Sequence, residues 1–281
     1  MIYAEPGRAR VALTAADVWF PLLTGAAVLA VTLLGDRLGG RIGGLLATAP
    51  VTTTAAHVLI ATSAPPDEAV ARVLLGVAAM LASTFGIVAF FYAVKYTRGR
   101  PSNARLFSGL GVYLGIFFGL TILFATFPLH PVSGFTLLFA SHAALAFTFM
   151  REPVPVLQGY VARATRRSVG ELAMRFAAGA LVVAAIRVLV NVYPPFAGAL
   201  AVVPAVFVVS LTVMGVAQNA PFAARAAQAG LFGTSAVAVF VLVIAGGLTL
   251  GLPIWPVVPF AWAAYASTLY ALGGLHRRLA R

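Results

Sequence analysis

The sequence predicts an all-α, polytopic helical membrane protein with about nine transmembrane helices, built as two inverted-topology repeats with kinked or broken proline helices. Three observations carry this prediction: the composition, the spacing of the apolar runs, and a similarity between the two halves of the chain. Of the 281 residues, 61% are hydrophobic and 9% are charged, whereas soluble domains are about a quarter charged. Lipid is therefore the expected solvent for much of the surface.

Nine apolar runs are long enough to cross a bilayer, which takes about 20 residues. They fall at 18–35, 42–62, 70–95, 105–127, 132–150, 171–192, 196–216, 228–250 and 254–275. We expect residues 1–17 to form an extracytoplasmic segment without a removable signal peptide. The remaining divisions are a first repeat (18–127), a linking span (128–150), a basic cytoplasmic loop (151–170) and a second repeat with a basic tail (171–281).

The basic residues agree with this count of spans. Nine spans place 15 of the 19 Lys and Arg residues on one face and leave Arg8, Arg10, Arg72 and Arg187 on the other. Because cytoplasmic loops are rich in Lys and Arg, the N-terminus is predicted outside and the C-terminus in the cytoplasm of an inner (plasma) membrane. The net charge of +12 then indicates contacts with anionic lipid headgroups at the cytoplasmic face rather than with nucleic acid. Residues 158–175 are predicted to include a basic amphipathic segment on that surface.

Shifting the chain by 154 residues aligns its two halves without a gap. The matches include Gly25 with Gly179, Gly44 with Gly198, Pro50 with Pro204 and Gly76 with Gly230. Five spans separate equivalent points, so equivalent helices are predicted to run in opposite directions. Many secondary transporters share this plan of inverted repeats.

A proline interrupts the second span. Proline removes a backbone donor and clashes with the preceding turn, so the helix is expected to kink or break just before Pro50. The hydroxyl groups of Thr52, Thr53 and Thr54 could bond the freed carbonyls or face a cavity. A helix that begins at Pro50 would also direct a partial positive charge towards the midplane. Pro50 and Gly44, with Pro204 and Gly198 in the second half, thus mark the predicted helix breaks. The alternative is that proline and threonine are ordinary constituents of a membrane helix here and that Gly39, Gly43 and Gly44 allow close helix packing.

Ionisable side chains within the spans are candidates for contact with a solute. His57 lies about two turns beyond Pro50, His142 lies in the fifth span, and Arg187 lies in the outer third of the sixth. The alternatives are a histidine bonded to a backbone carbonyl and an arginine that extends to the headgroups. All seven carboxylates fall in loops or at span ends, which disfavours a cation pump and favours a neutral or anionic solute.

No enzyme motif is present, so no catalytic residue, cofactor or metal site is predicted. The favoured function is a secondary transporter or permease for a small neutral or anionic solute, with alternating access about a midplane site between the repeats. A non-catalytic membrane subunit or assembly factor of a larger complex is the first alternative, and a lipid scramblase or flippase is the second. The sequence is compatible with a homo-oligomer.

One segment resembles a known family. Gly44-Leu45, Pro50, the three threonines, Ala56-His57 and a short polar turn before an apolar span resemble the small bacterial membrane proteins called GlpM-like. The similarity covers residues 44–95, whereas the second half shares only Gly198, Leu200 and Pro204 and has Leu211 at the position of the histidine. The resemblance implies a compact helical unit, doubled in this chain, and marks Pro50 and His57. It implies no activity.

Overall fold

The structure, a computed structural model, describes residues 15–38, 48–127, 168–192, 205–217 and 219–279, with isolated residues between 133 and 149 and residue 201. In this part of the chain the long elements are all α-helices, and no strand occurs. The helices are α1 (Ala15–Leu38), α3 (Val51–Ser63), α4 (Pro66–Tyr96), α5 (Ser102–Thr126), α7 (Val169–Val192), α9 (Ala205–Ala217), α10 (Ala220–Thr249) and α11 (Ile254–Leu279). The predicted all-α class is confirmed for these residues.

Four of the described helices are long and apolar enough to cross a membrane: Pro66–Tyr96, Ser102–Thr126, Val169–Val188 and Ala220–Thr249. Large apolar side chains lie exposed on two of these helices: Phe107 and Ile122 on α5, and Leu181 on α7. Such surfaces are unfavourable in water and suit lipid tails. The chain is therefore a helical membrane protein, whereas the count of nine spans stays a prediction because several expected spans lie partly or largely outside the described residues.

Two predicted boundaries need correction. The helix expected at 228–250 begins at Ala220, eight residues earlier, because Asn219 accepts a hydrogen bond from Phe222 N and a proline occupies the first turn. Arg225 made this segment look like a loop, but its side chain is exposed on the surface of α10. The basic amphipathic segment predicted to end at Arg175 is also wrong at that end, since α7 already begins at Val169.

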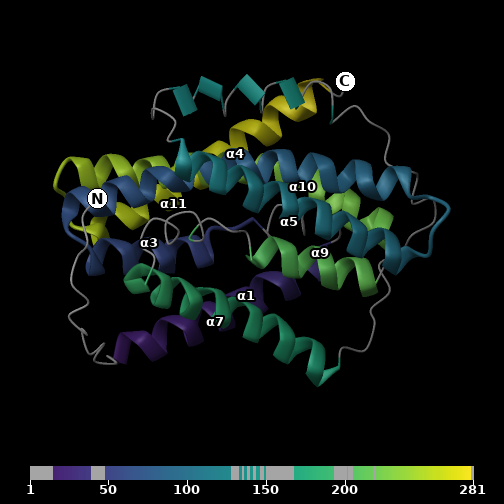
Figure 1. The fold of residues 1–281 in the computed structure, drawn as a ribbon, viewed down its shortest axis with the longest axis horizontal. Coiled ribbons are helices and arrows are strands. Elements are labelled where there is room, and N and C mark those ends of the chain that lie inside the picture. The colour runs from purple at the N-terminus through teal and green to yellow at the C-terminus, as the bar shows by residue number, and fades with distance from the viewer. Residues whose placement is uncertain are drawn as a thin grey trace.

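The helices form three layers (Figure 1). α1 and α7 pack together in one outer layer, and the short helices α3 and α9 lie in the middle. α4 and α10 pack together on the other side, where α5 lies against α4 and α11 lies against α10. The two short helices are thus enclosed between two pairs of longer ones.

Contacts along α10 give the helix directions. The backbone N–H of Ala220 donates to Ser102 Oγ at 2.8 Å, so α10 begins beside the start of α5 and the end of α4. α4 and α10 are therefore antiparallel. Gly247 packs against Val257, and Phe240 packs against Trp262, so α11 runs back along α10.

The helix starts recur at a constant spacing along the chain. In the described part of the chain, α1 and α7 begin at 15 and 169, α3 and α9 at 51 and 205, and α4 and α10 at 66 and 220, which is a difference of 154 in each pair. The crossing of α1 and α7 brings together two glycines with the same spacing. A Cβ atom on Gly179 would lie 3.2 Å from Gly25 Cα and 2.6 Å from Val28 Cγ2, so this close approach requires glycine.

The two ends of the described bundle differ in charge. Basic side chains gather where α4 ends and α5 and α10 begin; they are Lys95, Arg98, Arg100, Arg105 and Arg225. Arg105 donates from Nε and Nη2 to the Val94 carbonyl, which satisfies an acceptor at the C-terminal end of α4. At the opposite end, Arg72 pairs with Glu68 at 2.6 Å.

Candidate functional site

The short helix α3 begins directly after Pro50. Residues Thr48 to Pro50 form a non-helical turn, and Thr54 N then donates to Pro50 O at 2.8 Å as the first turn of α3 closes. The Thr54 hydroxyl donates to the same carbonyl at 2.5 Å. This carbonyl is not one that the proline frees, because it already accepts from Thr54 N. The carbonyl that Pro50 frees, four residues earlier, lies outside the described residues, so the bonding predicted for the threonines stays a prediction.

The polar side chains in the first half of α3 face the protein interior. Thr52, Thr53 and His57 are buried, and Thr54 is half-buried. Trp262 Nε1, on α11, donates to Thr54 Oγ1 at 3.1 Å. α3 thus presents hydroxyl and imidazole groups to helices from the other half of the chain.

His57 lies two turns into α3 and is fully buried. Its Nδ1 is 2.7 Å from the Thr53 carbonyl, which can only accept, so Nδ1 carries the proton of this hydrogen bond. The ring meets Phe240 of α10 edge to face, with 6.5 Å between the centroids. The described structure provides no hydrogen-bond partner for His57 Nε2.

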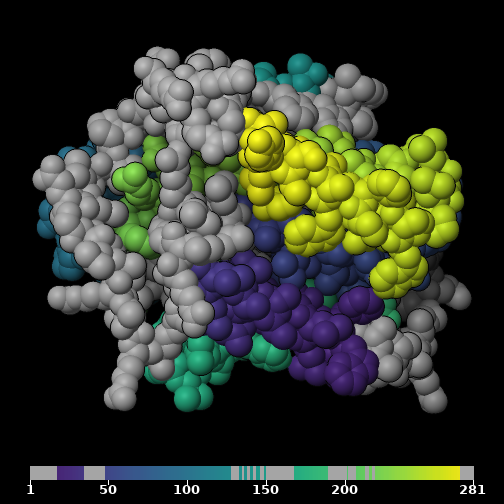
Figure 2. Space-filling view, turned by 180° about the vertical axis from the view of Figure 1, so that it is seen from behind, coloured from purple at the N-terminus to yellow at the C-terminus, as the bar shows by residue number. Residues whose placement is uncertain are grey.

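An aromatic cluster beside α3 was missed from the sequence. Phe240 packs against Trp262, Trp262 packs against Tyr265, and Tyr265 hydrogen-bonds the Thr48 side chain. The spacing of Trp262 and Tyr265 places them on one face of α11, which was the available signal. In Figure 2 a dark-blue strip of surface lies between α1 (purple) and α11 (yellow), where α3 packs against both. Trp262 and Thr54 are both half-buried, so the site comes nearest to the surface at this pair.

The second short helix, α9, begins at Ala205, which follows Pro204 in the sequence. Its buried side chains are mainly apolar, although Ser210 is buried too and its Oγ has no described hydrogen-bond partner. Phe207 occupies the position that corresponds to Thr53, 154 residues later. Its ring packs against Gly230 of α10 and against Tyr113 of α5, at 6.2 Å between the centroids of the two rings. The Tyr113 hydroxyl in turn hydrogen-bonds Ser83 Oγ at 3.0 Å.

α3 and α9 start close to each other and run in opposite directions. Thr48, just before α3, lies against Gly233, and Phe207 near the start of α9 lies against Gly230, one turn away on α10. From there α3 runs towards Phe240, whereas α9 runs towards Leu106, which contacts Gly215. Both glycines lie near the centre of α10, so the first described turns of α3 and α9 lie close together in the middle of the bundle. At α3, whose N-cap is Pro50, this places a helix N-terminus and its partial positive charge there.

The structure separates Arg187 from the threonines. Arg187 Nη1 donates to Ser63 Oγ, the last residue of α3, at 2.9 Å. α3 has 13 residues and is therefore about 20 Å long, so Arg187 lies at the far end of the helix from Thr52 and Thr53. The remaining predicted site residues, Gly44, His142, Gly198 and Pro204, lie outside the described residues.

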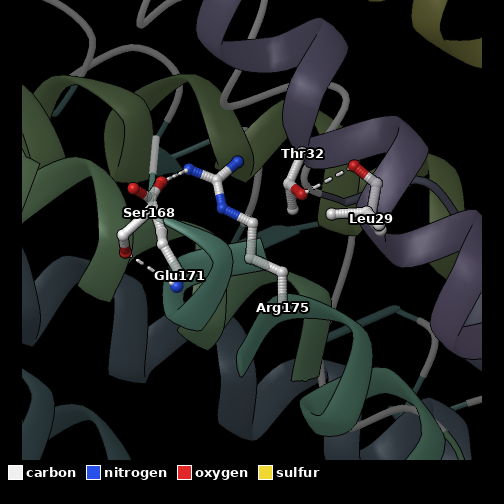
Figure 3. A network of polar contacts seen from close by, with 5 residues as sticks. All are labelled: Leu29, Thr32, Ser168, Glu171 and Arg175. Atoms are coloured by element: carbon white, nitrogen blue, oxygen red, sulfur yellow. Dashed lines mark hydrogen bonds and ion pairs between the residues drawn. The ribbon is translucent and has the colours of Figure 1, made fainter. Parts of the chain in front are cut away.

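A buried arginine was assigned to the wrong environment by the sequence. Arg175 is 1% exposed, and its Nη2 donates to Glu171 Oε1 at 2.5 Å. Ser168 Oγ accepts from the Glu171 backbone N–H and so caps the start of α7. Figure 3 shows Arg175 extending between α7 and Thr32 of α1. Expected on a cytoplasmic surface, Arg175 is instead enclosed between two helices.

The groups gathered around the start of α3 can form hydrogen bonds. The central groups are hydroxyls, an imidazole and helix N-termini, and the described residues hold no cluster of three His, Cys, Asp or Glu side chains for a metal ion. Comparisons with family models, curated proteins and solved structures found no match for this chain. The resemblance to GlpM-like proteins therefore stays a prediction.

Proposed function

We propose that this chain is a secondary transporter or permease for a small neutral or anionic solute, which binds near the midplane where α3 and α9 begin. The observation that carries the proposal is the convergence of these two helix starts on Gly230 and Gly233, from opposite directions. Interrupted helices whose ends meet at the bilayer centre are a recurrent way to bind solutes in transporters.

The proposal includes two inverted repeats. The constant spacing of 154 residues between helix starts supports it, as do the antiparallel α4 and α10 and the contact between Gly25 and Gly179. A twofold axis in the membrane plane would relate each of these pairs. Rocking of one helix pair against the other about the starts of α3 and α9 would then open the site to each side in turn.

The chemistry of the centre supports a solute without positive charge. Helix N-termini favour anions and hydrogen-bond acceptors, and the threonine hydroxyls of α3 can donate or accept. The described carboxylates of Asp67, Glu68 and Glu171 belong to first helical turns rather than to helix centres. A cation at the centre would find no counter-charge among them.

We propose an inner (plasma) membrane location, with the basic end of the bundle in the cytoplasm against anionic lipid headgroups. Asp67→Cys and Ser168→Cys test this orientation, because the chain has no native cysteine. A membrane-impermeant thiol reagent should label Asp67→Cys only from outside and Ser168→Cys only from inside. Labelling of both from the same side would contradict the topology and, with it, the inversion.

A second candidate function is a non-catalytic membrane subunit or assembly factor. The burial of Thr52, Thr53 and His57 favours it, because a sealed interior suits a structural role. Single cysteine substitutions at Thr52 and at its counterpart Val206 distinguish a transporter from a structural subunit. Transport predicts that Thr52→Cys reacts with a small thiol reagent from water as the site opens and that Val206→Cys reacts less; a structural subunit predicts that neither reacts.

Pro50→Ala provides the functional test. The substitution permits the helix to continue through the turn that now separates Thr48 from α3. Solute flux into proteoliposomes should fall while thermal stability is largely kept. Unchanged flux in this variant, or the absence of flux for every neutral and anionic solute tested with the wild-type chain, would contradict the proposal.

A further inference from the structure

The Nε2 atom of His57 is a buried acceptor. Because Nδ1 donates to the Thr53 carbonyl, the neutral ring presents a lone pair at Nε2. This atom is shielded from solvent, and no described group bonds to it. The ring neighbour Phe240 offers only carbon atoms. A buried acceptor without a donor costs free energy, and such groups call for an explanation.

The second half of the chain shows that packing does not require this imidazole. Leu211 occupies the corresponding position of α9, 154 residues later, and it is 0% exposed, as is His57. Leu211 belongs to an apolar cluster with Phe207 and Leu231. A leucine thus fills the corresponding position of the other short helix without leaving a polar atom unsatisfied.

The surroundings of His57 select for an uncharged partner. The stretches of α4 and α10 beside the centre of α3 carry no charged side chain, and on α7 Arg187 bonds Ser63, six residues or about 9 Å of helix rise beyond His57. Moving an ion into such a region is costly without a counter-charge. The lone pairs of an anion would also repel the lone pair of Nε2, whereas a neutral N–H or O–H group would donate a hydrogen bond to it.

We propose that His57 Nε2 accepts a hydrogen bond from an uncharged solute with an N–H or O–H donor, such as an amide or a polyol, between α3 and α10. This inference rests on the proposed transport function and narrows its solute class from neutral or anionic to neutral donors. The Thr53 carbonyl holds the imidazole in the tautomer that makes Nε2 the acceptor.

Binding is tested first, without any need for transport. The full chain is labelled with ¹⁵N-histidine, and the His57 Nε2 resonance is identified by its loss in His57→Leu. Urea and glycerol, as donors, should shift this resonance, whereas tetramethylurea, which has no N–H or O–H group, should not. No shift with either donor, or an equal shift with tetramethylurea, would overturn the inference.

Flux is tested second, by light scattering from proteoliposomes that shrink and recover in urea or glycerol. His57→Leu should lower the protein-dependent urea flux about tenfold, since one hydrogen bond to the solute is lost. His57→Gln restores an acceptor and should recover part of the flux. Thr121→Val is the matched control, because it also removes a buried oxygen without a described partner, but on α5. Its flux should equal that of the wild type.

The two tests distinguish failure of the inference from failure of the proposed function. Wild-type flux that His57→Leu leaves unchanged, with an unmoved Nε2 resonance, overturns the inference and leaves transport standing. A donor-specific Nε2 shift without flux of any solute supports the inference and counts against transport. Equal loss of flux in His57→Leu and Thr121→Val would assign the effect to packing and overturn the inference.

Discussion

The two short helices α3 and α9 have the same length and start near the same point, yet their inward side chains differ in kind. Thr53 and His57 of α3 correspond to Phe207 and Leu211 of α9, 154 residues later in the chain. All four are buried. Each helix position therefore accommodates either polar or apolar groups, so the polarity of α3 is not needed to build an interrupted helix.

Glycines on α10 explain how both helix starts reach the centre. A Cβ on Gly233 would collide with the Thr48 side chain, and a Cβ on Gly230 would lie 2.4 Å from the Phe207 ring. In the second half that space is filled by an aromatic ring, whereas the first half places hydroxyls and an imidazole along its helix. The difference indicates one polar site and one packed counterpart, rather than two equal sites.

Phe207→Ala should give the largest loss of stability. Removing a fully buried phenylalanine leaves a cavity next to Gly230 and Tyr113, and the expected cost is about 4 kcal/mol in the free energy of unfolding. Thr53→Ala, its counterpart in α3, should cost less than half of this and yet lower solute flux more. Thermal unfolding in detergent and proteoliposome flux measure the two effects. If Phe207→Ala lost more flux than Thr53→Ala at the same folded fraction, the polar site could not be assigned to α3.

Glu171→Gln should have the next largest effect. Arg175 is 1% exposed and Glu171 24%, so removing the carboxylate takes the counter-charge from an enclosed guanidinium, at an expected cost of about 3 kcal/mol. Glu68→Gln is the matched control, because Glu68 and Arg72 form the same i,i+4 pair with 59% and 11% exposure. Its expected cost is below about 0.5 kcal/mol. Equal midpoints of thermal unfolding for the two variants would show that the buried pair contributes no more to stability than the exposed one.

The sequence predicted the helical class, the helix start after Pro50 and the spacing of 154 residues, because apolar runs, proline and glycine act locally or recur in register. It did not predict the aromatic cluster around Trp262 or the burial of Arg175. In a membrane protein both the lipid-facing and the buried faces of a helix are apolar, so periodicity gives little indication of which side chains turn inward. Tyr265 turns inward to hydrogen-bond Thr48, and the sequence gives no sign of this contact because the two residues are far apart in the chain.

Gly233→Ala tests the close approach of the turn before α3. The added Cβ would overlap Thr48 Oγ1, so the turn must move, at an expected cost of about 2 kcal/mol. Gly246→Ala is the control on the same helix, since a Cβ there meets no atom within 4 Å. Gly246→Ala should leave thermal stability unchanged or raise it slightly. If Gly233→Ala were as stable as Gly246→Ala, Thr48 would not approach α10 as closely as described.

Thr54→Val should have the smallest effect on stability. It gives α3 the residue that α9 already has at the corresponding position, Val208, and so tests one polar contact that only α3 makes. The substitution removes the hydroxyl that donates to Pro50 O and accepts from Trp262 Nε1, for an expected net loss of about 1 kcal/mol. Thr212→Val of α9 is the control, since it removes a hydroxyl that bonds only a carbonyl of its own helix among the contacts described. Only Thr54→Val should change the fluorescence of Trp262, measured with Trp19 and Trp255 replaced by phenylalanine. Because the indole N–H would lose its acceptor where the half-buried Thr54 and Trp262 meet, the same variant should make the site easier to reach from outside the bundle. An unaltered Trp262 emission would mean that the indole N–H does not depend on Thr54, and α3 would then lose its polar link to α11.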